Sequence, residues 1–236
     1  MILSGFFALS ASLLYIFSSL FIWQKIRLFD QVSPGSHRHR IIFFAILATL
    51  FHFIALSMTL WQANNFAFNL GNALSMISLL ASGILLVLNR QYQAEILGIF
   101  IFPLAALSTL IPIGFPSYTP LALEIGSHVL ISIAAYSLLG IAAAQAILYS
   151  IQEKRFRKRQ LSNLMRALPP LQVMEALMFK LLIIGFIFLS FALISGAFFV
   201  EDLFAQHLVH KTFFAIISWI LYGVLLAGHF KQGWRG

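Results

Sequence analysis

The amino-acid sequence predicts an all-α integral membrane protein, a bundle of about seven transmembrane helices that forms a single domain over residues 1–236. Three observations predict this class. Hydrophobic residues make up 61% of the chain and charged residues 9%. The apolar residues gather in uncharged runs of about 20, the length at which an α-helix crosses roughly 30 Å of hydrocarbon. These runs are apolar on every face, whereas the strands of a membrane β-barrel would alternate in hydrophobicity over about 10 residues.

Each span is identified from one such run. The first has no charge before Lys25, so it lacks the basic start of a signal peptide and is expected to remain in the protein. Trp23 and Trp61 end the first two runs as interfacial anchors. Pro103 and Pro112 should kink or shorten the fourth helix, because proline has no backbone N–H to donate. In order, the expected spans lie near residues 3–23, 41–61, 70–88, 94–112, 127–150, 176–199 and 211–230.

The third, fifth and sixth runs also contain small residues. Small side chains let neighbouring membrane helices approach closely, so we expect these positions to form packing faces. They are Gly71, Ser75, Ser78, Ser82, Ser132, Gly140, Ala144, Gly185, Ser195 and Gly196.

The basic residues predict the orientation of the chain in the plasma (inner) membrane. They follow the first, third, fifth and seventh runs, and Lys211 is the exception. By the positive-inside rule these connections are cytoplasmic, which places the N-terminus outside and the C-terminus inside. The net charge of +8 is therefore expected to set topology. It does not point to nucleic acid, because the charges are divided among short loops.

The chain contains no cysteine, which excludes every function that depends on a thiol group. A disulfide, a thiolate metal site and the Cys-x-x-Cys-His attachment of a c-type haem are all excluded. The sequence also has no glycine-rich phosphate loop beside a strand, so it does not predict nucleotide chemistry.

The longest cytoplasmic connection, residues 151–170, is predicted to form an amphipathic helix on the inner membrane surface. Pro169 and Pro170 would end this helix before the sixth span. We expect residues 151–168 to bind anionic lipids, and the alternative is a docking site for a cytoplasmic partner. The apolar side is formed by Phe156, Leu161, Leu164, Met165 and Leu168, and the basic side by Arg155, Arg157, Lys158, Arg159 and Arg166.

Three histidines lie within or at the ends of apolar runs. An ionisable side chain at membrane depth is costly and is a functional candidate by default. With a rise of about 1.5 Å per helical residue, His52 lies about 16 Å above Ile41, near mid-membrane. His128 lies at the outer face at the start of the fifth span, and His229 lies at the inner face near the end of the seventh.

His210, just before the seventh span, is also expected at the outer face, with His207 one turn earlier if that stretch is helical. A pair such as His128 and His210, on different helices at one depth, has the arrangement needed to hold an iron from both sides, because neutral imidazole is the ligand form. The alternative is that each histidine is structural and bonds to a neighbouring carbonyl. His37 and His39, in a basic loop, are expected to have no special role.

Several motifs carry a resemblance to a known family. They are His52 with Leu56, Ser127-His128-Val129, Pro169-Pro170-Leu171, Ser195-Gly196-Ala197, Trp219, Tyr222, Gly228-His229 and Gly233-Trp234-Arg235-Gly236. With these residues the chain resembles the cytochrome c assembly (CcsA/CcmC-type) family of haem-handling membrane proteins, in particular its HemX-like and YpjD-like branch. The similarity covers most of the chain, and the Gly-Trp-Arg-Gly ending is its most specific motif.

The resemblance implies a protein that binds haem b and passes it outward, or senses it, with histidines as axial ligands. His128 resembles the outward-facing ligand, His229 the histidine of the last matched span, and His52 a membrane histidine of the early part. On straight helices His52 and His229 would differ in height by roughly 15 Å, so they are not expected to hold one iron.

Two features depart from the family's pattern. Haem-delivery members carry a tryptophan-rich outer segment before the last matched span, whereas residues 199–211 contain no tryptophan. The resemblance therefore does not extend to attaching haem to an apocytochrome. Relatives usually continue into one more span with another outer histidine, so either this is a shortened form or His207 or His210 takes that role.

The sequence leaves three functions open. The first is haem binding in cytochrome c assembly or haem trafficking, through His128 with His210 or His207, alongside other assembly or membrane proteins. The second is a haem-free scaffold or regulatory subunit that acts through the basic connection. The third is a small-solute transporter, which lacks the intramembrane carboxylate that proton coupling would need. No residue forms a credible acid, base or nucleophile in a cleft, so we expect binding and transfer more than conventional catalysis.

Overall fold

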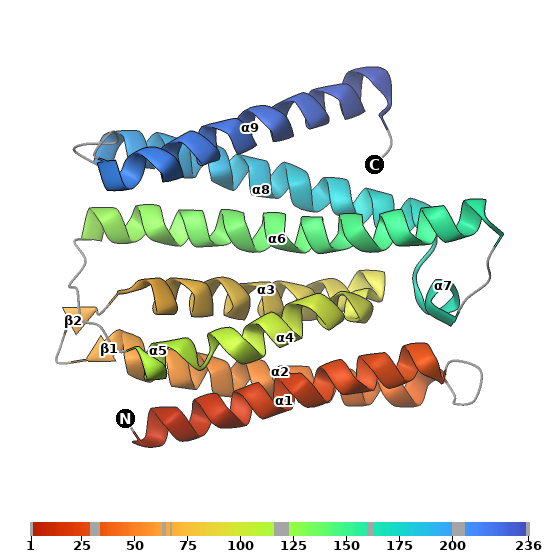
Figure 1. Cartoon of the computed structure of the whole chain (residues 1–236), viewed down its shortest axis with the longest axis horizontal. Coiled ribbons are helices and arrows are strands. Elements are labelled where there is room, and N and C mark those ends of the chain that lie inside the picture. Colours follow the sequence, from red (N-terminus) through yellow and green to blue (C-terminus); the bar gives the residue numbers. More distant parts are fainter. Residues whose placement is uncertain are drawn as a thin grey trace.

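The computed structural model describes residues 2–28, 34–62, 65–66, 68–115, 123–159, 163–199 and 206–234. Long α-helices that lie roughly side by side account for most of them (Figure 1). Two strands of two residues each, β1 (Trp61–Gln62) and β2 (Asn65–Phe66), form an antiparallel hairpin between α2 (Pro34–Leu60) and α3 (Leu70–Tyr92) in the chain. The helices are α1 (Ile2–Arg27), α2 (Pro34–Leu60), α3 (Leu70–Tyr92), the 3-10 helix η1 (Ala94–Leu97), α4 (Gly98–Ser108), α5 (Ile111–Gly114), α6 (Leu123–Arg157), α7 (Asn163–Ala167), α8 (Leu171–Phe199) and α9 (Gln206–Gln232).

Among the residues that the structure describes, seven stretches are long and apolar enough to cross a membrane, which confirms the predicted all-α, multi-pass fold. The helices run several residues beyond the apolar runs. The clearest case is α6, whose 35 residues span about 52 Å, far more than the hydrocarbon thickness. Its last turns therefore extend past the membrane core. The seven stretches are 2–27, 38–60, 70–92, 94–114, 125–157, 171–198 and 212–232.

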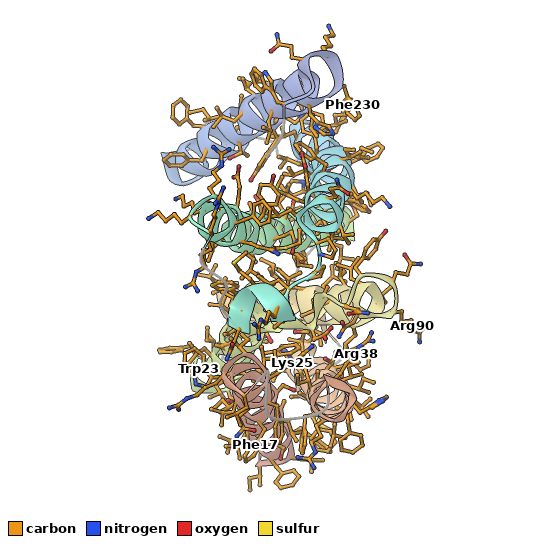
Figure 2. The ribbon with its side chains drawn as sticks, turned by 90° about the vertical axis from the view of Figure 1, so that its right-hand side faces the viewer. Phe17, Trp23, Lys25, Arg38, Arg90 and Phe230 are labelled. Carbon is orange, nitrogen blue, oxygen red and sulfur yellow. The ribbon has the colours of Figure 1, made fainter. Side chains whose placement is uncertain are left out.

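The bundle has two chemically different ends. At one end, on the right of Figure 1, α1, α3, α6 and α9 finish and α2 begins. We call this the basic end, because Arg27, Arg40, Arg90, Arg157 and Lys231 lie there. The other end is called the opposite end, and the two chain termini lie at different ends (Figure 1). Figure 2 looks onto the basic end, with Phe17, Trp23 and Phe230 on the outer surface of the bundle.

The helices pack as two halves. In the first half, α1 and α2 pack along their lengths, and α3 and α4 lie against them. In the second half, α6 packs closely on α8, and α9 lies on the outer side of α8 (Figure 1). Contact between α3 and α6 joins the halves.

The fourth span is broken as its prolines predict. Pro103 lies inside α4, which stops at Ser108, and Pro112 lies in the first turn of the separate helix α5. The span also begins sharply, since Gln93 takes a left-handed conformation (φ 50°) directly between α3 and η1. At Gly98 a Cβ would overlap the side chains of Phe102 and Ile22, so glycine allows this span to approach α1.

Most of the small residues that the structure describes lie on faces that pack against other helices, as predicted. Ser75, Ser78 and Ser82 are buried on α3, and a Cβ on Gly185 would meet Leu139 of α6. The expectation for Gly140 was wrong: it is exposed and has no neighbouring atom within 4 Å of a Cβ. Gly140 lies on a face of α6 that points to lipid, which sequence spacing alone did not distinguish from the packed face.

The connection between α6 and α8 folds differently from the single surface helix predicted for 151–168. Residues 151–157 continue α6, and the described part of the remaining connection contains the short helix α7. Asn163 donates a hydrogen bond to the carbonyl of Arg27 (3.2 Å), and Leu168 is buried. Seen from the basic end, α7 lies between the two halves (Figure 2). Leu168 is buried and Leu164 packs against the core, whereas Phe156 is exposed, so the protein covers part of the predicted apolar side.

Candidate functional site

His128 lies in the second turn of α6, at the opposite end. Its Nδ1 is 3.0 Å from the Oγ of Ser195 on α8, and that hydroxyl donates to the carbonyl of Ala192 (3.1 Å). The Ser195 oxygen therefore accepts from Nδ1–H, which leaves the lone pair of His128 on Nε2. A Cβ on Gly196 would lie only 3.1 Å from the ring carbon Cε1, so the glycine makes room for the imidazole.

His207 and His210 lie in the first turns of α9, so this stretch is helical and His207 lies one turn before His210. The start of α9 and the start of α6 both lie at the opposite end, which brings these two histidines to the same end as His128 (Figure 1). The side chains of His207 and His210 lie outside the described residues. The pairing of either one with His128 thus stays a prediction.

His229 lies near the last turn of α9, at the basic end. Its Nδ1 is 2.8 Å from the backbone carbonyl of Trp234, and a carbonyl can only accept, so Nδ1 carries the hydrogen and Nε2 the lone pair. The ring stacks on Phe179 of α8, with centroids 3.5 Å apart and planes at 14°. Together with Glu175, Lys180 and neighbouring residues of α8, His229 lines a cavity of about 380 Å³.

His52 is fully buried in the first half and has a different environment. Its Nε2 is 2.8 Å from the Oγ of Ser75 on α3, and its Nδ1 is 3.3 Å from the hydroxyl of Tyr15 on α1. Both ring nitrogens are therefore hydrogen-bonded. Binding of an iron, as predicted for His52, would require one of these bonds to break. Sequence reasoning missed both partners, because it could not tell which polar residues of spans one and three face His52.

The structure thus distributes the candidate histidines over three places. His52 lies in α2, whereas His229 lies in α9 on the far side of the bundle, so they cannot hold one iron (Figure 1). Within the described part of the chain, no group of three or more His, Asp or Glu side chains could hold a metal ion. A metal bound by one or two of these histidines would have to bring further ligands with it.

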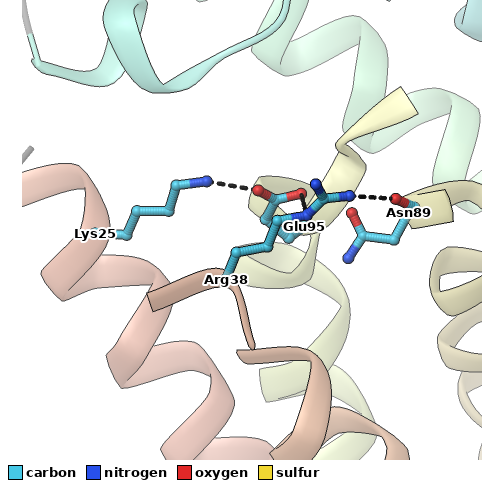
Figure 3. A network of polar contacts seen from close by, with 4 residues as sticks. All are labelled: Lys25, Arg38, Asn89 and Glu95. Carbon is cyan, nitrogen blue, oxygen red and sulfur yellow. Dashed lines mark hydrogen bonds and ion pairs between the residues drawn. The ribbon is translucent and has the colours of Figure 1, made fainter. Parts of the chain in front are cut away.

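Sequence reasoning also missed a buried charge network at the basic end. The ammonium of Lys25 is 2.5 Å from Oε1 of Glu95, whose side chain is 1% exposed. Arg38 donates from Nη2 to the carbonyl of Asn89 (2.8 Å), and its Nε is 4.0 Å from Oε2 of Glu95 (Figure 3). The network ties α1, α2, α3 and η1 together. Glu95 lies in η1 at the start of the fourth span and serves as an internal counter-ion.

A groove of about 1230 Å³ lies between α2, α3 and α6. Among the described residues, its wall is apolar apart from Thr49 and Ser57 and contains no histidine or charged residue. The hydroxyl of Thr49 is already bonded to the carbonyl of Ala45 (2.7 Å). The groove therefore offers shape and apolar surface but no side chain suited to bind a metal.

Comparison with known proteins agrees with this architecture. The family model described as "Cytochrome C assembly protein" matches residues 2–236. The "Inner membrane protein YpjD" of Escherichia coli K12 is 27% identical over 208 residues, which is 86% of this chain and 79% of the relative. An "Uncharacterized 28.8 kDa protein in nifR3-like 5'region" of Azospirillum brasilense is 29% identical over 111 residues, 46% of this chain and 41% of the relative. No solved structure matches.

The seven spans and the inner-membrane relative identify a multi-pass plasma-membrane protein. The family match across almost the full length supports a role in cytochrome c maturation. The chain belongs to the cytochrome c assembly protein family.

Proposed function

We propose that this protein binds haem b through His128 and presents it during cytochrome c assembly. The observation that carries the proposal is the orientation of His128. Ser195 holds Nδ1–H and Gly196 accommodates the ring, so the Nε2 lone pair is left for a ligand. Neutral imidazole with its second nitrogen tied to an oxygen acceptor is the arrangement of a metal-binding histidine.

One or two histidines can be enough to hold haem. Haem iron already has four porphyrin nitrogens and needs only one or two axial ligands from the protein. His128 would supply one ligand, and His210 or His207, on the first turns of α9 at the same end, would supply the other. Bound haem would provide the iron centre, while Ser195 keeps the imidazole in the ligating tautomer.

We further propose that the basic end faces the cytoplasm. The exposed basic residues gather at this end of the bundle, and by the positive-inside rule such connections stay cytoplasmic. The N-terminus would then lie outside and the C-terminus inside. His128 would lie at the outer face, where a haem can be passed outward to an assembly partner.

A haem titration of the detergent-purified protein tests the proposal. The wild type should give a low-spin b-type spectrum in its oxidised and reduced forms, and His128→Ala should abolish it. His39→Ala is the matched control, because His39 is exposed at the basic end and should have no effect. A His128→Ala variant that keeps the wild-type spectrum and affinity would contradict the assignment.

Ser195→Ala probes the orientation of His128 separately from the ligand itself. Removing the oxygen that accepts from Nδ1–H should weaken haem binding about 10- to 100-fold, as for other outer partners of metal-binding histidines. Ser195→Thr keeps an acceptor oxygen and should retain most of the affinity. Equal haem affinity in all three proteins would show that Ser195 has no positioning role.

A second function, a haem-free scaffold that acts through the basic connection, is favoured by one observation. Phe156 is 65% exposed beside the exposed side chains of Arg157, Lys158 and Arg159. Such a surface suits anionic lipids or an acidic partner. Replacing Lys158 and Arg159 with Gln should reduce binding to anionic vesicles and recovery of partners in a pull-down, while haem binding stays unchanged. Unchanged vesicle binding and partner recovery would count against it.

A further inference from the structure

The apolar groove between α2, α3 and α6 opens onto the outside of the bundle. Its residues recur every three or four positions along α2 and α3, so each of these helices presents one continuous face to it. Large side chains on that face of α2, such as Ile46, Leu50 and Phe53, are exposed and meet the membrane interior. Gly83 of α3 deepens the groove, because a Cβ there would meet no atom within 4 Å. In a membrane such a groove is filled either by lipid chains or by another helix.

The side chains of the groove suit a lipid chain better than a helix. Membrane helices associate at small residues or through hydrogen bonds between polar side chains. The described wall contains one glycine, and the hydroxyls of Thr49 and Ser57 already donate to carbonyls of α2, at 2.7 and 2.8 Å. The other residues are Leu, Ile, Met and Phe, and the flexible methionines in particular can fill irregular gaps. The wall therefore offers little to hold a helix and much to cover an acyl chain.

An arginine and a histidine lie at the basic end of the same two faces. Arg90 lies one turn beyond Leu86 on α3, and His39 lies two turns before the groove on α2. The bond from Arg38 to the carbonyl of Asn89 (2.8 Å) brings these two helix ends together. Arg90 is exposed at the outer edge of the bundle (Figure 2), and it forms no ion pair with any residue that the structure describes. Its guanidinium is therefore available to an anion at the mouth of the groove.

The length of the site matches one lipid molecule. At about 1.5 Å per residue, Met76 lies about 21 Å along α3 from Arg90. A bilayer with its headgroups is about 40–45 Å thick, so one lipid spans roughly 20–22 Å. Arginine holds a phosphate through two parallel N–H groups, and it repels the cation that a zwitterionic headgroup carries beside its phosphate. The site is therefore suited to a lipid with a net negative headgroup.

We propose that the groove binds one anionic phospholipid from the membrane leaflet at the basic end, with its phosphate at Arg90 and His39 and its acyl chains along α2 and α3. The site lies apart from His128 and requires no haem, so it goes beyond the function proposed above. Because its walls belong to both halves of the bundle, the lipid also adds contact between α2 of the first half and α6 of the second.

Lipid titration of the delipidated, full-length protein in detergent tests the headgroup end. The probes are phosphatidylglycerol and phosphatidylcholine with the same acyl chains, and native mass spectrometry counts the lipids bound. The wild type should bind one phosphatidylglycerol about fivefold more tightly than phosphatidylcholine, the difference expected from one basic side chain near a lipid phosphate. Arg90→Gln should remove this preference and leave phosphatidylcholine binding unchanged, whereas Arg90→Lys keeps the charge and should retain most of it.

Gly83→Leu tests where the acyl chains lie. The new side chain would occupy the groove without meeting protein atoms, so the tightly bound phosphatidylglycerol should be lost. Gly5→Leu is the matched control, because a Cβ at Gly5 of α1 also meets no atom within 4 Å but lies outside the groove. This variant should bind lipid as the wild type does. Thermal unfolding in detergent checks that both variants are folded, and a folded Gly83→Leu protein with wild-type lipid binding would overturn the inference.

The basic connection supplies a second control. Lys158→Gln combined with Arg159→Gln removes two exposed charges at the same end of the bundle, away from the groove, and should keep the phosphatidylglycerol preference. Loss of the preference in this variant, but not in Arg90→Gln, would place the lipid on the connection and overturn the inference. Equal affinity of the wild type for both lipids would do the same. A complex of two chains that Gly83→Leu dissociates, with lipid binding unchanged, would show instead that the groove holds a helix.

Discussion

The two halves of the bundle are held together by different chemistry. The first half has a polar interior, with the Tyr15–His52–Ser75 contacts in its middle, a Ser78–Ser108 contact of 2.5 Å, and the Lys25–Glu95 pair at the basic end. In the second half, α6 and α8 meet mainly through apolar side chains. Among the residues described there, the buried polar side chains are Ser137, Gln145 and Gln152.

This difference has a physical basis and a functional consequence. Lipid tails are as apolar as leucine, so burying apolar side chains does not by itself drive helices together in a membrane. Membrane helices associate through hydrogen bonds or through close packing at small residues. In the first half, both nitrogens of His52 are hydrogen-bonded to side chains of neighbouring helices. In the second half, His128 and His229 each have Nδ1 within hydrogen-bond distance of an oxygen atom. The haem ligand proposed above, His128, lies in this half.

The largest effect is expected where the first half buries charge. Glu95→Gln would leave Lys25 and Arg38 without their shared carboxylate in a nearly dry site, which should lower the free energy of unfolding by about 3–5 kcal/mol. The measurement is equilibrium unfolding or thermal stability in detergent. Glu153→Gln is the matched control, because Glu153 pairs with an exposed Arg157 at 2.7 Å and should lose less than about 1 kcal/mol.

A double variant sharpens the test of this network. If the loss in the single variant comes from an uncompensated ammonium, Lys25→Met combined with Glu95→Leu should recover part of the stability. Equal losses for Glu95→Gln and Glu153→Gln would mean that water reaches the Glu95 network freely. The first half would then not depend on buried charge.

The next effect concerns His52. His52→Ala would leave the hydroxyl of Ser75 without its side-chain partner, at about 1–3 kcal/mol, whereas the Tyr15 hydroxyl keeps its bond to Thr49 (3.4 Å). His52→Gln should lose less, because an amide can restore one bond. Neither variant should change the haem spectrum. Loss of haem with His52→Ala in a protein that remains folded would move the ligand site into the first half and break the comparison.

Much of the fold could be predicted from the sequence, because long apolar runs specify spans strongly in a solvent that cannot hydrogen-bond to the backbone. The break between α4 and α5, just before Pro112, followed from proline geometry. The extension of α6 to Arg157 could not be read from hydropathy, because a helix does not end where its apolar run ends. The exposed position of Gly140 depends on which neighbour a helix face meets, and spacing on one helix does not encode that.

The candidate site could be predicted only in part, for a related reason. His128 and His229 stood out because an imidazole in an apolar run is unusual. Their partners did not, since Ser195 is 67 residues away from His128 and the partner of His229 is a backbone carbonyl. A carbonyl has no sequence signal of its own. The nearest signal was the Gly228-His229 and Gly233-Trp234 pattern, whose glycines make that contact possible.

The smallest expected effect tests how the second half is packed. A Cβ on Gly185 would lie 2.8 Å from Cγ of Leu139, so Gly185→Ala should push α8 from α6 and lower the free energy of unfolding by about 1–3 kcal/mol. Gly140→Ala, on the lipid face of α6, meets no atom within 4 Å and should instead gain up to about 1 kcal/mol from the better helix propensity of alanine. Thermal unfolding in detergent measures both variants. A loss of stability in Gly185→Ala together with a gain in Gly140→Ala would show that the close approach of α8 to α6 at Gly185 stabilises this half. A loss of equal size in both variants would mean that glycine matters for helix flexibility, and the contrast between a polar and a packed half would no longer explain the bundle.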